Sequence, residues 1–247
     1  MAAWRLIQPV LEVVANHQGR DFVVGDLHGS LELLTEALAT LEFDRQVDRL
    51  FSVGDLIDRG PSSMQLLSWL GEPWFFACVG NHESVLLDYM NSESPNVAQN
   101  WQQFGGAWFF QLTRDEQLNI ADKIRNHMHV AIEIQSSLGQ PDVGIVHADV
   151  PYQLSWHEFK QSIAAQEEDV VYQTLWSRQR GRGELQSEVK GVRLVVCGHE
   201  IVAKAHKRAN VWLLDTGAYL SGVARGKLSL LELPETLRDF TLPSTKS

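Results

Sequence analysis

Three short apolar runs, each followed by a glycine and a cluster of polar residues, constrain this chain more than any other feature. The runs are residues 22–24, 50–53 and 74–79, and the polar clusters that follow them are residues 25–29, 54–60 and 80–83. Short runs rich in Val and Phe and bounded by glycine are typical of buried strands. The segments between them, residues 31–41 and 62–70, carry apolar residues at helical spacing. This order predicts an α/β fold in which the strands pair in parallel through crossover helices.

The polar side chains of these clusters are expected to converge, although they lie far apart in the sequence. In a parallel sheet the carboxyl ends of the strands share one edge, and ligands bind there. Two later apolar runs, residues 143–146 and 194–197, also end in a histidine, His147 and His199. Carboxylate, amide and imidazole groups suit divalent ions that accept oxygen and nitrogen ligands. We therefore predict a site for two metals near Asp26, His28, Asp55, Asp58, Arg59, Asn81 and His82.

The rest of the chain is predicted to complete a single domain of residues 1–247. Residues 1–20 are interpreted as an irregular or helical lead-in, residues 81–90 as a helix, and residues 91–140 as a helical insertion packed beside the sheet. Within the insertion, Thr113 and Glu116 form a predicted capping box, and the aromatic-rich residues 101–110 are interpreted as its core. Residues 234–247 are polar without a clear period and are expected to form a flexible tail. Further strands are expected at residues 130–134, 143–147, 193–197, 211–215 and 227–231.

The composition limits the classes of partner. The formal net charge is −10 and the isoelectric point about 5.3, which argues against nonspecific binding to nucleic acid, because such binding relies on a basic surface. The N-terminal residues lack the apolar block of a signal peptide, and no apolar stretch approaches membrane-spanning length. Cys78 and Cys197 lie in predicted strands and are interpreted as core residues. We therefore expect a cytoplasmic protein without nucleic-acid or membrane partners, whose oligomeric state the sequence leaves open.

From about residue 21 to residue 231, the chain resembles the PPP family of metal-dependent phosphoprotein phosphatases, especially the small bacterial and phage-lambda-type serine/threonine phosphatases. The resemblance rests on five motifs in order and at suitable spacing: Gly-Asp-Leu-His-Gly at 25–29, Gly-Asp-Leu-Ile-Asp-Arg-Gly at 54–60, Gly-Asn-His-Glu at 80–83, His147, and Gly198-His199. Any one of them alone is weak, but the series is specific. It implies the calcineurin-like metallophosphoesterase fold, a β-sandwich flanked by helices with the metal centre at one strand edge.

The resemblance also implies a role for each site residue. Asp26 and His28 would hold the first metal, and Asp55 would bridge both metals. Asn81, His147 and His199 would complete the ligands of the second metal. His82 would be the general acid, oriented by Asp58, while Arg59 and Arg178 would bind the phosphate. The region of Arg178 matches less well, so Arg180 and Arg182 stay open as alternatives. Manganese fits the mixed oxygen and nitrogen ligands, with iron, zinc and cobalt as alternatives.

The activity that the resemblance implies is hydrolysis of phosphoserine and phosphothreonine in phosphoproteins, by in-line attack of a metal-bridging hydroxide. Phosphotyrosine and small aryl phosphates are further candidate substrates. One residue departs from the pattern: many family members have arginine immediately before the Gly-Asn-His-Glu motif, and this chain has Val79. That departure leaves the substrate range open.

Other functions are weighed against particular residues. Nuclease-like relatives usually carry Gly-His-x-His at the last motif, where this chain has Ile201. Dinucleotide polyphosphate hydrolases and phosphodiesterases of the same superfamily are the nearest alternative, but the dinucleotide enzymes tend to lack Asp58 and to have aspartate in place of Glu83. Asp215 lies in a segment that matches an aspartic-protease loop, and we interpret it as a strand end with a tight turn. A non-catalytic phosphoprotein-binding scaffold would not need His82 and Asp58 together.

Overall fold

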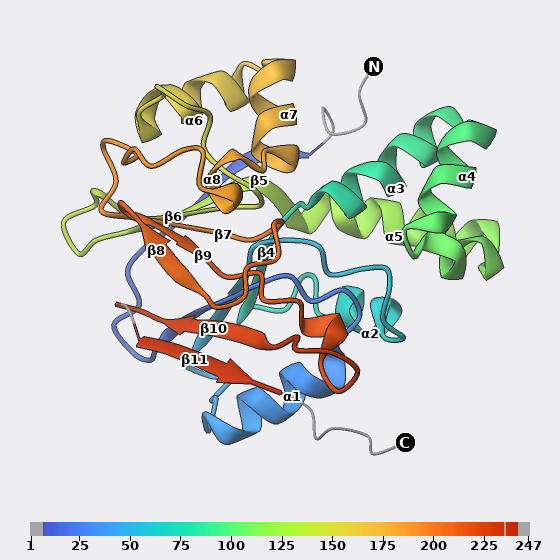
Figure 1. The fold of residues 1–247 in the computed structure, drawn as a ribbon, viewed down its shortest axis with the longest axis horizontal. Helices are drawn as coiled ribbons and strands as arrows, with labels where there is room; N and C mark the ends of the chain where they lie inside the picture. The colour runs from blue at the N-terminus through green and yellow to red at the C-terminus, as the bar shows by residue number, and fades with distance from the viewer. Residues whose placement is uncertain (1–6, 235, 242–247) are drawn as a thin grey trace.

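A sheet of eleven strands forms the centre of the computed structural model, which describes residues 7–234 and 236–241 (Figure 1). The strands are β1 (Gln8–Val13), β2 (Asp21–Val24), β3 (Arg49–Ser52), β4 (Phe75–Cys78), β5 (Met128–Gln135), β6 (Pro141–Val146), β7 (Leu194–Cys197), β8 (His206–Arg208), β9 (Val211–Leu213), β10 (Leu228–Glu232) and β11 (Thr236–Phe240). They are hydrogen-bonded in the order β11-β10-β2-β3-β4-β5-β6-β7-β9-β8, and β1 pairs with β5 beside this path.

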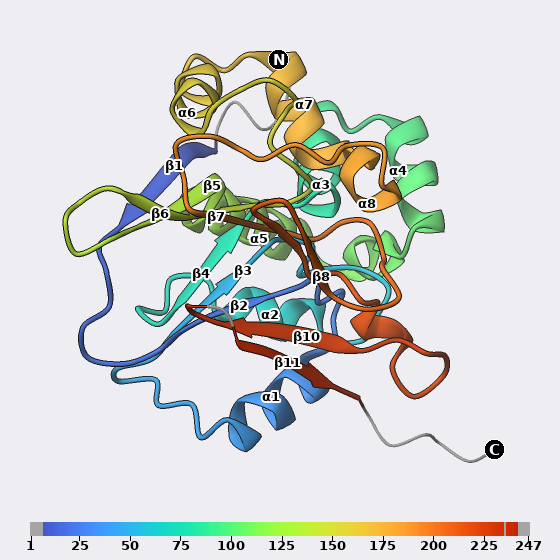
Figure 2. The ribbon, with the colours of Figure 1, turned by 60° about the vertical axis from the view of Figure 1, so that its left-hand side comes forward.

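The helices lie between the strands in sequence and on the outer sides of the sheet in space (Figures 1 and 2). They are α1 (Leu31–Thr40), α2 (Ser63–Ser68), α3 (Asn81–Ser92), α4 (Pro95–Gln103), α5 (Arg114–His127), α6 (Trp156–Ala164), α7 (Glu168–Trp176) and α8 (Gln179–Arg182), with 3-10 helices η2 (Gly106–Gln111) and η3 (Ala218–Leu220). None of the helices in the described part of the chain combines the length and the apolar character that a membrane span requires.

The first half of the chain pairs as its pattern predicts. β2, β3 and β4 are parallel neighbours, with Val23 opposite Phe51 and Phe51 opposite Phe76. The crossovers contain α1 and α2, whose apolar residues Leu34 and Leu66 are fully buried. The sheet as a whole is mixed, because β10 and β6 run antiparallel to their neighbours β2 and β5. Because β2, β3 and β4 run parallel to one another, all three end at the same edge of the sheet.

The sheet curls on itself around an inner core. Val23 of β2 and Val196 of β7 pack in the same buried cluster, although four strands separate β2 from β7 along the sheet. Leu231 of β10 joins them. A larger apolar cluster fills the space between the outer faces of the sheet and the helices, and includes Leu34, Leu66 and Trp101. This curled sheet with flanking helices is the α/β architecture that the sequence predicted.

Three segments differ from the prediction. The lead-in contains β1, which pairs in parallel with β5 and is neither irregular nor helical; Pro9 and Glu12 interrupt its apolar pattern, yet Val10 and Val13 still find partners opposite Ala131 and Ile134. The expected tail contains β11, which pairs antiparallel with β10. The expected helical insertion is shorter than residues 91–140: α4, η2 and α5 occupy residues 95–127, and residues 128–135 form β5, between β4 and β6, which contains the strand expected at residues 130–134. Residues 1–6, 235 and 242–247 lie outside the described part of the chain.

Two local predictions are confirmed. Thr113 caps α5, since its backbone N–H donates to Glu116 Oε2 at 2.8 Å and its hydroxyl oxygen accepts from the Glu116 N–H at 3.4 Å. Cys78 and Cys197 lie in the core with fully buried side chains. Burial raises the pKa of both thiols, so they are unreactive apolar residues at neutral pH.

Candidate metal centre

The loops that follow five strands bring the predicted site residues to one edge of the sheet. Asp26 and His28 follow β2, Asp55, Asp58 and Arg59 follow β3, Asn81 and His82 begin α3 after β4, His147 follows β6, and His199 follows β7. Apart from Arg59, which is exposed, all of these side chains are buried. Burying so many polar groups is unfavourable unless each one finds a hydrogen-bond partner or a metal ion.

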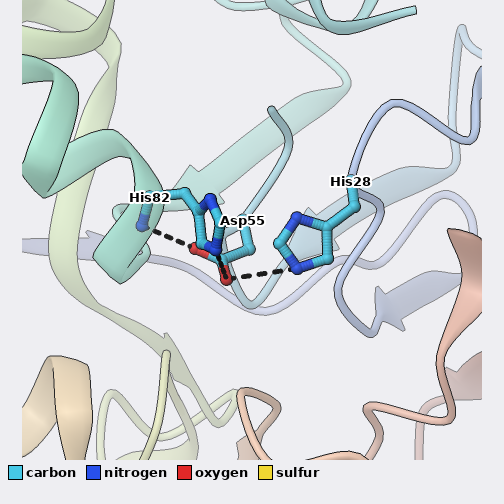
Figure 3. A group of neighbouring side chains, drawn as sticks. All are labelled: His28, Asp55 and His82. Carbon is cyan, nitrogen blue, oxygen red and sulfur yellow. Dashed lines mark hydrogen bonds and ion pairs between the residues drawn. The ribbon is translucent and has the colours of Figure 1, made fainter. Parts of the chain in front are cut away.

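Asp55 lies at the centre of this cluster (Figure 3). Its Oδ2 atom lies 3.4 Å from His28 Nε2, 3.6 Å from His147 Nε2 and 4.0 Å from His82 Nε2, while its Oδ1 atom accepts the backbone N–H of His82 at 3.0 Å. Two groups of three potential ligand atoms therefore share Asp55. One group is His28, Asp55 and His82, the other is Asp55, His147 and His199, and the atoms of each lie within 4.8 Å of one another.

The histidines present lone pairs to this centre. Burial lowers the pKa of His28 to about 3 and of His199 to about 2, and it also lowers the pKa of His147. Nδ1 of His28 donates to the carbonyl of Ile57 at 2.9 Å, and Nδ1 of His147 donates to the carbonyl of Val53 at 3.0 Å. These bonds leave Nε2 of each ring unprotonated and directed at Asp55, as in histidines that bind metals.

One atom in particular fits a metal ion. Nε2 of His199 is buried and finds no hydrogen-bond partner among the described residues. An orphaned buried nitrogen is rare in folded proteins, and a metal ion would satisfy it. The other two predicted ligands also lie in the cluster. Both Asp26 carboxylate oxygens accept the His199 backbone N–H at 3.1 Å. Asn81 Oδ1 lies 2.9 Å from the unprotonated His147 Nε2, so two lone pairs face each other and a cation near them would satisfy both atoms.

Negative charge accumulates around these atoms. Burial, with the nearby charges of Asp215 and Asp55, raises the pKa of Asp26 well above its ordinary value. Burial also raises the pKa of Asp215 to about 7. For Asp55 the effect of burial is outweighed by His147, His82 and His28, and its pKa is lowered. Cations at the centre would stabilise the ionised form of all three carboxylates.

Sequence reasoning missed the contribution of Asp215 and underestimated that of Glu83. Asp215 does form the expected tight turn, accepting the Gly217 N–H at 2.9 Å, but it also faces the charge of Asp26. The buried Glu83 carboxylate accepts four backbone N–H groups, from Gly80 at 2.8 Å and from residues 55, 56 and 57 at 3.0, 2.8 and 3.3 Å. It thus ties the Asp55 loop to the start of α3. Burial raises its pKa to about 7.

The backbone at the centre is strained. His28, Asp55, Asp58, Arg59 and His199 all have positive φ angles, between 42° and 72°. Such conformations are unfavourable for residues other than glycine and occur together where a site requires them. Two glycines make room for the carboxylates: a Cβ atom at Gly198 would lie 1.9 Å from Asp26 Oδ1, and one at Gly80 would lie 2.1 Å from Asp55 Oδ1. The glycines of the motifs are therefore steric requirements of the cluster.

His82 combines a carboxylate partner with a position at the edge of the centre. Its Nδ1 atom lies 2.6 Å from Asp58 Oδ2. Burial lowers the pKa of His82, but the charges of Asp55 and Asp58 outweigh burial and raise it. Arg59 Nη2 lies 3.2 Å from His82 Nε2 and the guanidinium stacks over Tyr219 at 4.7 Å. Because a guanidinium only donates, its contact uses the His82 lone pair, and protonation of Nε2 requires Arg59 to move away.

A cleft of about 450 Å³ opens beside His82 and distinguishes the three candidate arginines. Its lining includes Arg59, Asn81, His82, Trp101, Trp176 and Arg178. Arg178 reaches this cleft and pairs with Glu200. Arg180 is 2% exposed and its Nε lies 2.9 Å from Asp149 Oδ1, whereas Arg182 is exposed and lies 3.5 Å from Glu200. Val79 is buried in the core and does not line the cleft.

The sequence of this chain is similar to that of known proteins. Residues 22–203 match the family model described as calcineurin-like phosphoesterase. The chain is 35% identical over 215 residues to serine/threonine-protein phosphatase 2 of Escherichia coli (strain K12), covering 85% of this chain and 93% of that protein. It is 47% identical to the symmetrical bis(5'-nucleosyl)-tetraphosphatase of Pseudomonas putida (strain W619), but only over 68 residues, which are 27% of this chain and 24% of that enzyme.

The fold is shared more widely than the sequence. A protein serine/threonine phosphatase from Saccharomyces cerevisiae superposes with a TM-score of 0.67 over 99% of this chain and 87% of that one, at 16% identity. At that identity the likeness concerns the architecture alone, and the curled sheet with its flanking helices is what the two chains have in common.

Proposed function

Because the chain belongs to the calcineurin-like phosphoesterase family, we propose that it removes phosphate from phosphoserine and phosphothreonine residues of proteins, with phosphotyrosine and aryl phosphates as further substrates. The observation that carries the proposal is the 2.6 Å bond between His82 and Asp58, with His82 Nε2 4.0 Å from the Asp55 carboxylate that the two groups of potential ligands share. An imidazole that can take up and donate a proton next to a metal centre is the combination that a phosphate monoester with a basic leaving oxygen requires. The relative from Escherichia coli, named a serine/threonine-protein phosphatase, supports the same substrate class.

We further propose that the centre holds two divalent ions. As the family resemblance implies, Asp26, His28 and Asp55 would bind one ion, and Asp55, Asn81, His147 and His199 would bind the other. Of these ligands, His28, Asp55, His147 and His199 belong to the two groups whose atoms lie together. Manganese suits these oxygen and imidazole ligands, and iron, zinc and cobalt are alternatives. When bound, such ions supply charge neutralisation for the phosphoryl group and activate water at neutral pH. The shared position of Asp55, with one carboxylate facing both groups, supports the pairing.

The remaining residues act on the phosphate and on the leaving oxygen. Arg59 and Arg178 line the cleft next to His82 and would hold phosphoryl oxygens by charge-assisted hydrogen bonds. A bound phosphate would draw Arg59 away from His82 Nε2, so that this nitrogen can carry a proton. His82, held by Asp58, would then donate that proton to the departing serine or threonine oxygen, an effect worth about 10²–10⁴ in rate.

A second candidate is hydrolysis of dinucleotide polyphosphates, which the local 47% identity to the Pseudomonas putida tetraphosphatase favours. The leaving group in that reaction is itself a phosphate and is far less basic than an alkoxide. An acid held as His82 is held would contribute little to such a reaction. The phosphomonoesterase therefore agrees better with the geometry.

The test is hydrolysis of p-nitrophenyl phosphate by protein stripped of metal, with and without Mn²⁺, alongside His82→Asn. We expect turnover that depends on Mn²⁺. With a phosphoserine peptide as a second substrate, His82→Asn should lower kcat more for the peptide than for p-nitrophenyl phosphate. Absence of monoester turnover with manganese, cobalt, zinc or iron, together with cleavage of diadenosine tetraphosphate, would assign the protein to the second candidate instead.

A further inference from the structure

The Asp58 carboxylate receives three N–H donors, and two of them come from tryptophans. Trp101 Nε1 donates to Asp58 Oδ2 at 2.7 Å, and Trp108 Nε1 donates to Asp58 Oδ1 at 2.7 Å. His82 Nδ1 is the third donor, 2.6 Å from Oδ2. Asp58 itself is completely buried. The aromatic-rich residues 101–110 are the predicted core of the insertion, and these contacts give two of them a further role.

Three donors on two oxygens fix the plane of the carboxylate. An indole N–H can only donate, so both tryptophans require Asp58 to accept and stabilise its ionised form without adding charge. Because the two indoles bind different oxygens, rotation of the carboxylate would break at least one of these bonds. The lone pair that remains on Oδ2 is then directed at His82, which orients the imidazole ring toward the centre.

The fold delivers both indoles from one short segment. Trp101 lies near the end of α4 and Trp108 lies in η2, and the turn between them contains Gly105 and Gly106. Gly105 has a φ of 110°, and a Cβ atom there would lie 2.4 Å from the Arg59 backbone nitrogen. A Cβ atom at Gly106 would lie 2.4 Å from the Trp101 ring. These two glycines are therefore packed directly against Arg59 and the Trp101 ring.

We propose that Trp101 and Trp108 are positioning residues for the general acid, acting on His82 through Asp58. The proposal rests on the proposed phosphomonoesterase function. The insertion is then a part of the catalytic apparatus and not only a cover on the sheet. Loss of one indole N–H removes one of the three bonds that hold the carboxylate of Asp58 and loosens the alignment of His82, which matters in proportion to the basicity of the leaving oxygen.

The first experiment compares two substrates in Trp108→Phe, because Trp108 is half-buried and its replacement keeps a ring in place. We expect kcat for a phosphoserine peptide to fall by about 10-fold or more, and kcat for p-nitrophenyl phosphate, whose leaving group needs little protonation, by less than about 3-fold. KM should change little, because the indole does not contact phosphate. Trp101→Phe should show the same split with a larger loss of stability, since Trp101 is 2% exposed.

Trp156→Phe is the matched control. Its indole also donates to a buried carboxylate, Glu133 Oε2 at 2.6 Å, but Glu133 lies in β5, outside the site. This variant should melt at a lower temperature and keep the wild-type ratio of the two kcat values. In an Asp58→Asn background, Trp108→Phe should have almost no further effect on that ratio, because the group on which it acts is already changed.

A spectroscopic measurement makes the proposal testable without turnover. The proton in the short bond between His82 and Asp58 should give a low-field NMR resonance, which Trp108→Phe shifts and Trp156→Phe leaves in place. The proposal is overturned if Trp108→Phe leaves this resonance unmoved, lowers both kcat values equally, or adds its full effect to Asp58→Asn. Failure of the proposed function is a separate result, since it would appear as absent monoester turnover in the wild-type protein.

Discussion

Arginines only a few positions apart in this chain have very different environments. Arg178 lines the cleft beside His82, and its neighbour in space is Glu200. The Arg180 guanidinium is buried against Asp149 and also donates to the carbonyl of Ser187 at 2.8 Å. The spacing of three arginines in five residues could not separate these roles, because burial depends on where Asp149 lies after folding.

Replacement of Arg178 should affect substrate binding, and replacement of Arg180 should affect stability. Arg178→Ala removes a charge that faces the cleft, so we expect KM for phosphomonoesters to rise about 10- to 100-fold with little change in melting temperature. Arg180→Ala leaves the Asp149 carboxylate buried without its cation and should destabilise the protein by about 3–5 kcal/mol. Steady-state kinetics and thermal unfolding of both variants measure this, with the exposed Arg182→Ala as control. Equal KM values for Arg178→Ala and the wild type would exclude Arg178 as a phosphate ligand.

Prediction from sequence worked best at residues whose position follows from covalent proximity to a buried strand. Asp26, Asp55 and Asn81 each come directly after a glycine that ends such a run, and the structure places them at one edge. The supporting residues were harder to find. Trp101 and Trp108 reach Asp58 across more than forty positions, and nothing in the local pattern of an aromatic-rich segment reports a hydrogen bond at that distance.

At the scale of elements, the central strands were predictable and the outer ones were not. β7 is buried throughout and appears as an unbroken apolar run, and β2 and β3 each contain a buried apolar run, Phe22–Val24 and Leu50–Phe51. β1 and β11 have polar residues among their apolar ones and β8 is His-Lys-Arg, so each of these strands is defined by the strand that it pairs with. Pairing of this kind depends on tertiary contacts, which a single sequence does not display.

Because β11 pairs with β10, its removal should lower the melting temperature, whereas removal of a flexible tail should not. β11 lies against β10, whose Ser229 donates to Asp239 Oδ1 at 2.7 Å, and Ser229 in turn accepts the Gly25 N–H at 3.1 Å through its carbonyl. Deleting residues 236–247 should lower the melting temperature by roughly 5–10 °C, because several strand bonds next to the Asp26 loop are lost. Deleting only residues 242–247, which leaves β11 in place, is the control. Identical melting curves for the two deletions would contradict a structural role for β11.

At the scale of the whole molecule, buried histidines and buried carboxylates pull stability in opposite directions. Burial lowers the pKa of His28 to about 3, of His129 to about 4 and of His199 to about 2. Their contribution to stability is complete above the unfolded value of 6.5 and is lost as the pH falls. Burial raises the pKa of Glu83 and Asp215 to about 7. Their contribution is complete below the unfolded values of 4.5 and 3.8 and is lost as the pH rises through 7.

The two trends offset each other between pH 4.5 and 6.5, so metal-free protein should be most stable in that window and lose stability on both sides. Divalent ions change the balance, because they need neutral imidazoles and ionised carboxylates, the forms that prevail at higher pH. Mn²⁺ should therefore raise the melting temperature more at pH 8 than at pH 5.5 and move the optimum above pH 7. Thermal unfolding across this range, with chelator or with Mn²⁺, measures both effects, and Asp55→Ala should abolish the manganese-dependent part. The contrary outcome is a melting temperature of the metal-free protein that rises steadily from pH 6.5 to 8.5. It would mean that other groups of the protein already stabilise the ionised form of the buried carboxylates. The electrostatic argument for cations at this centre would then be wrong.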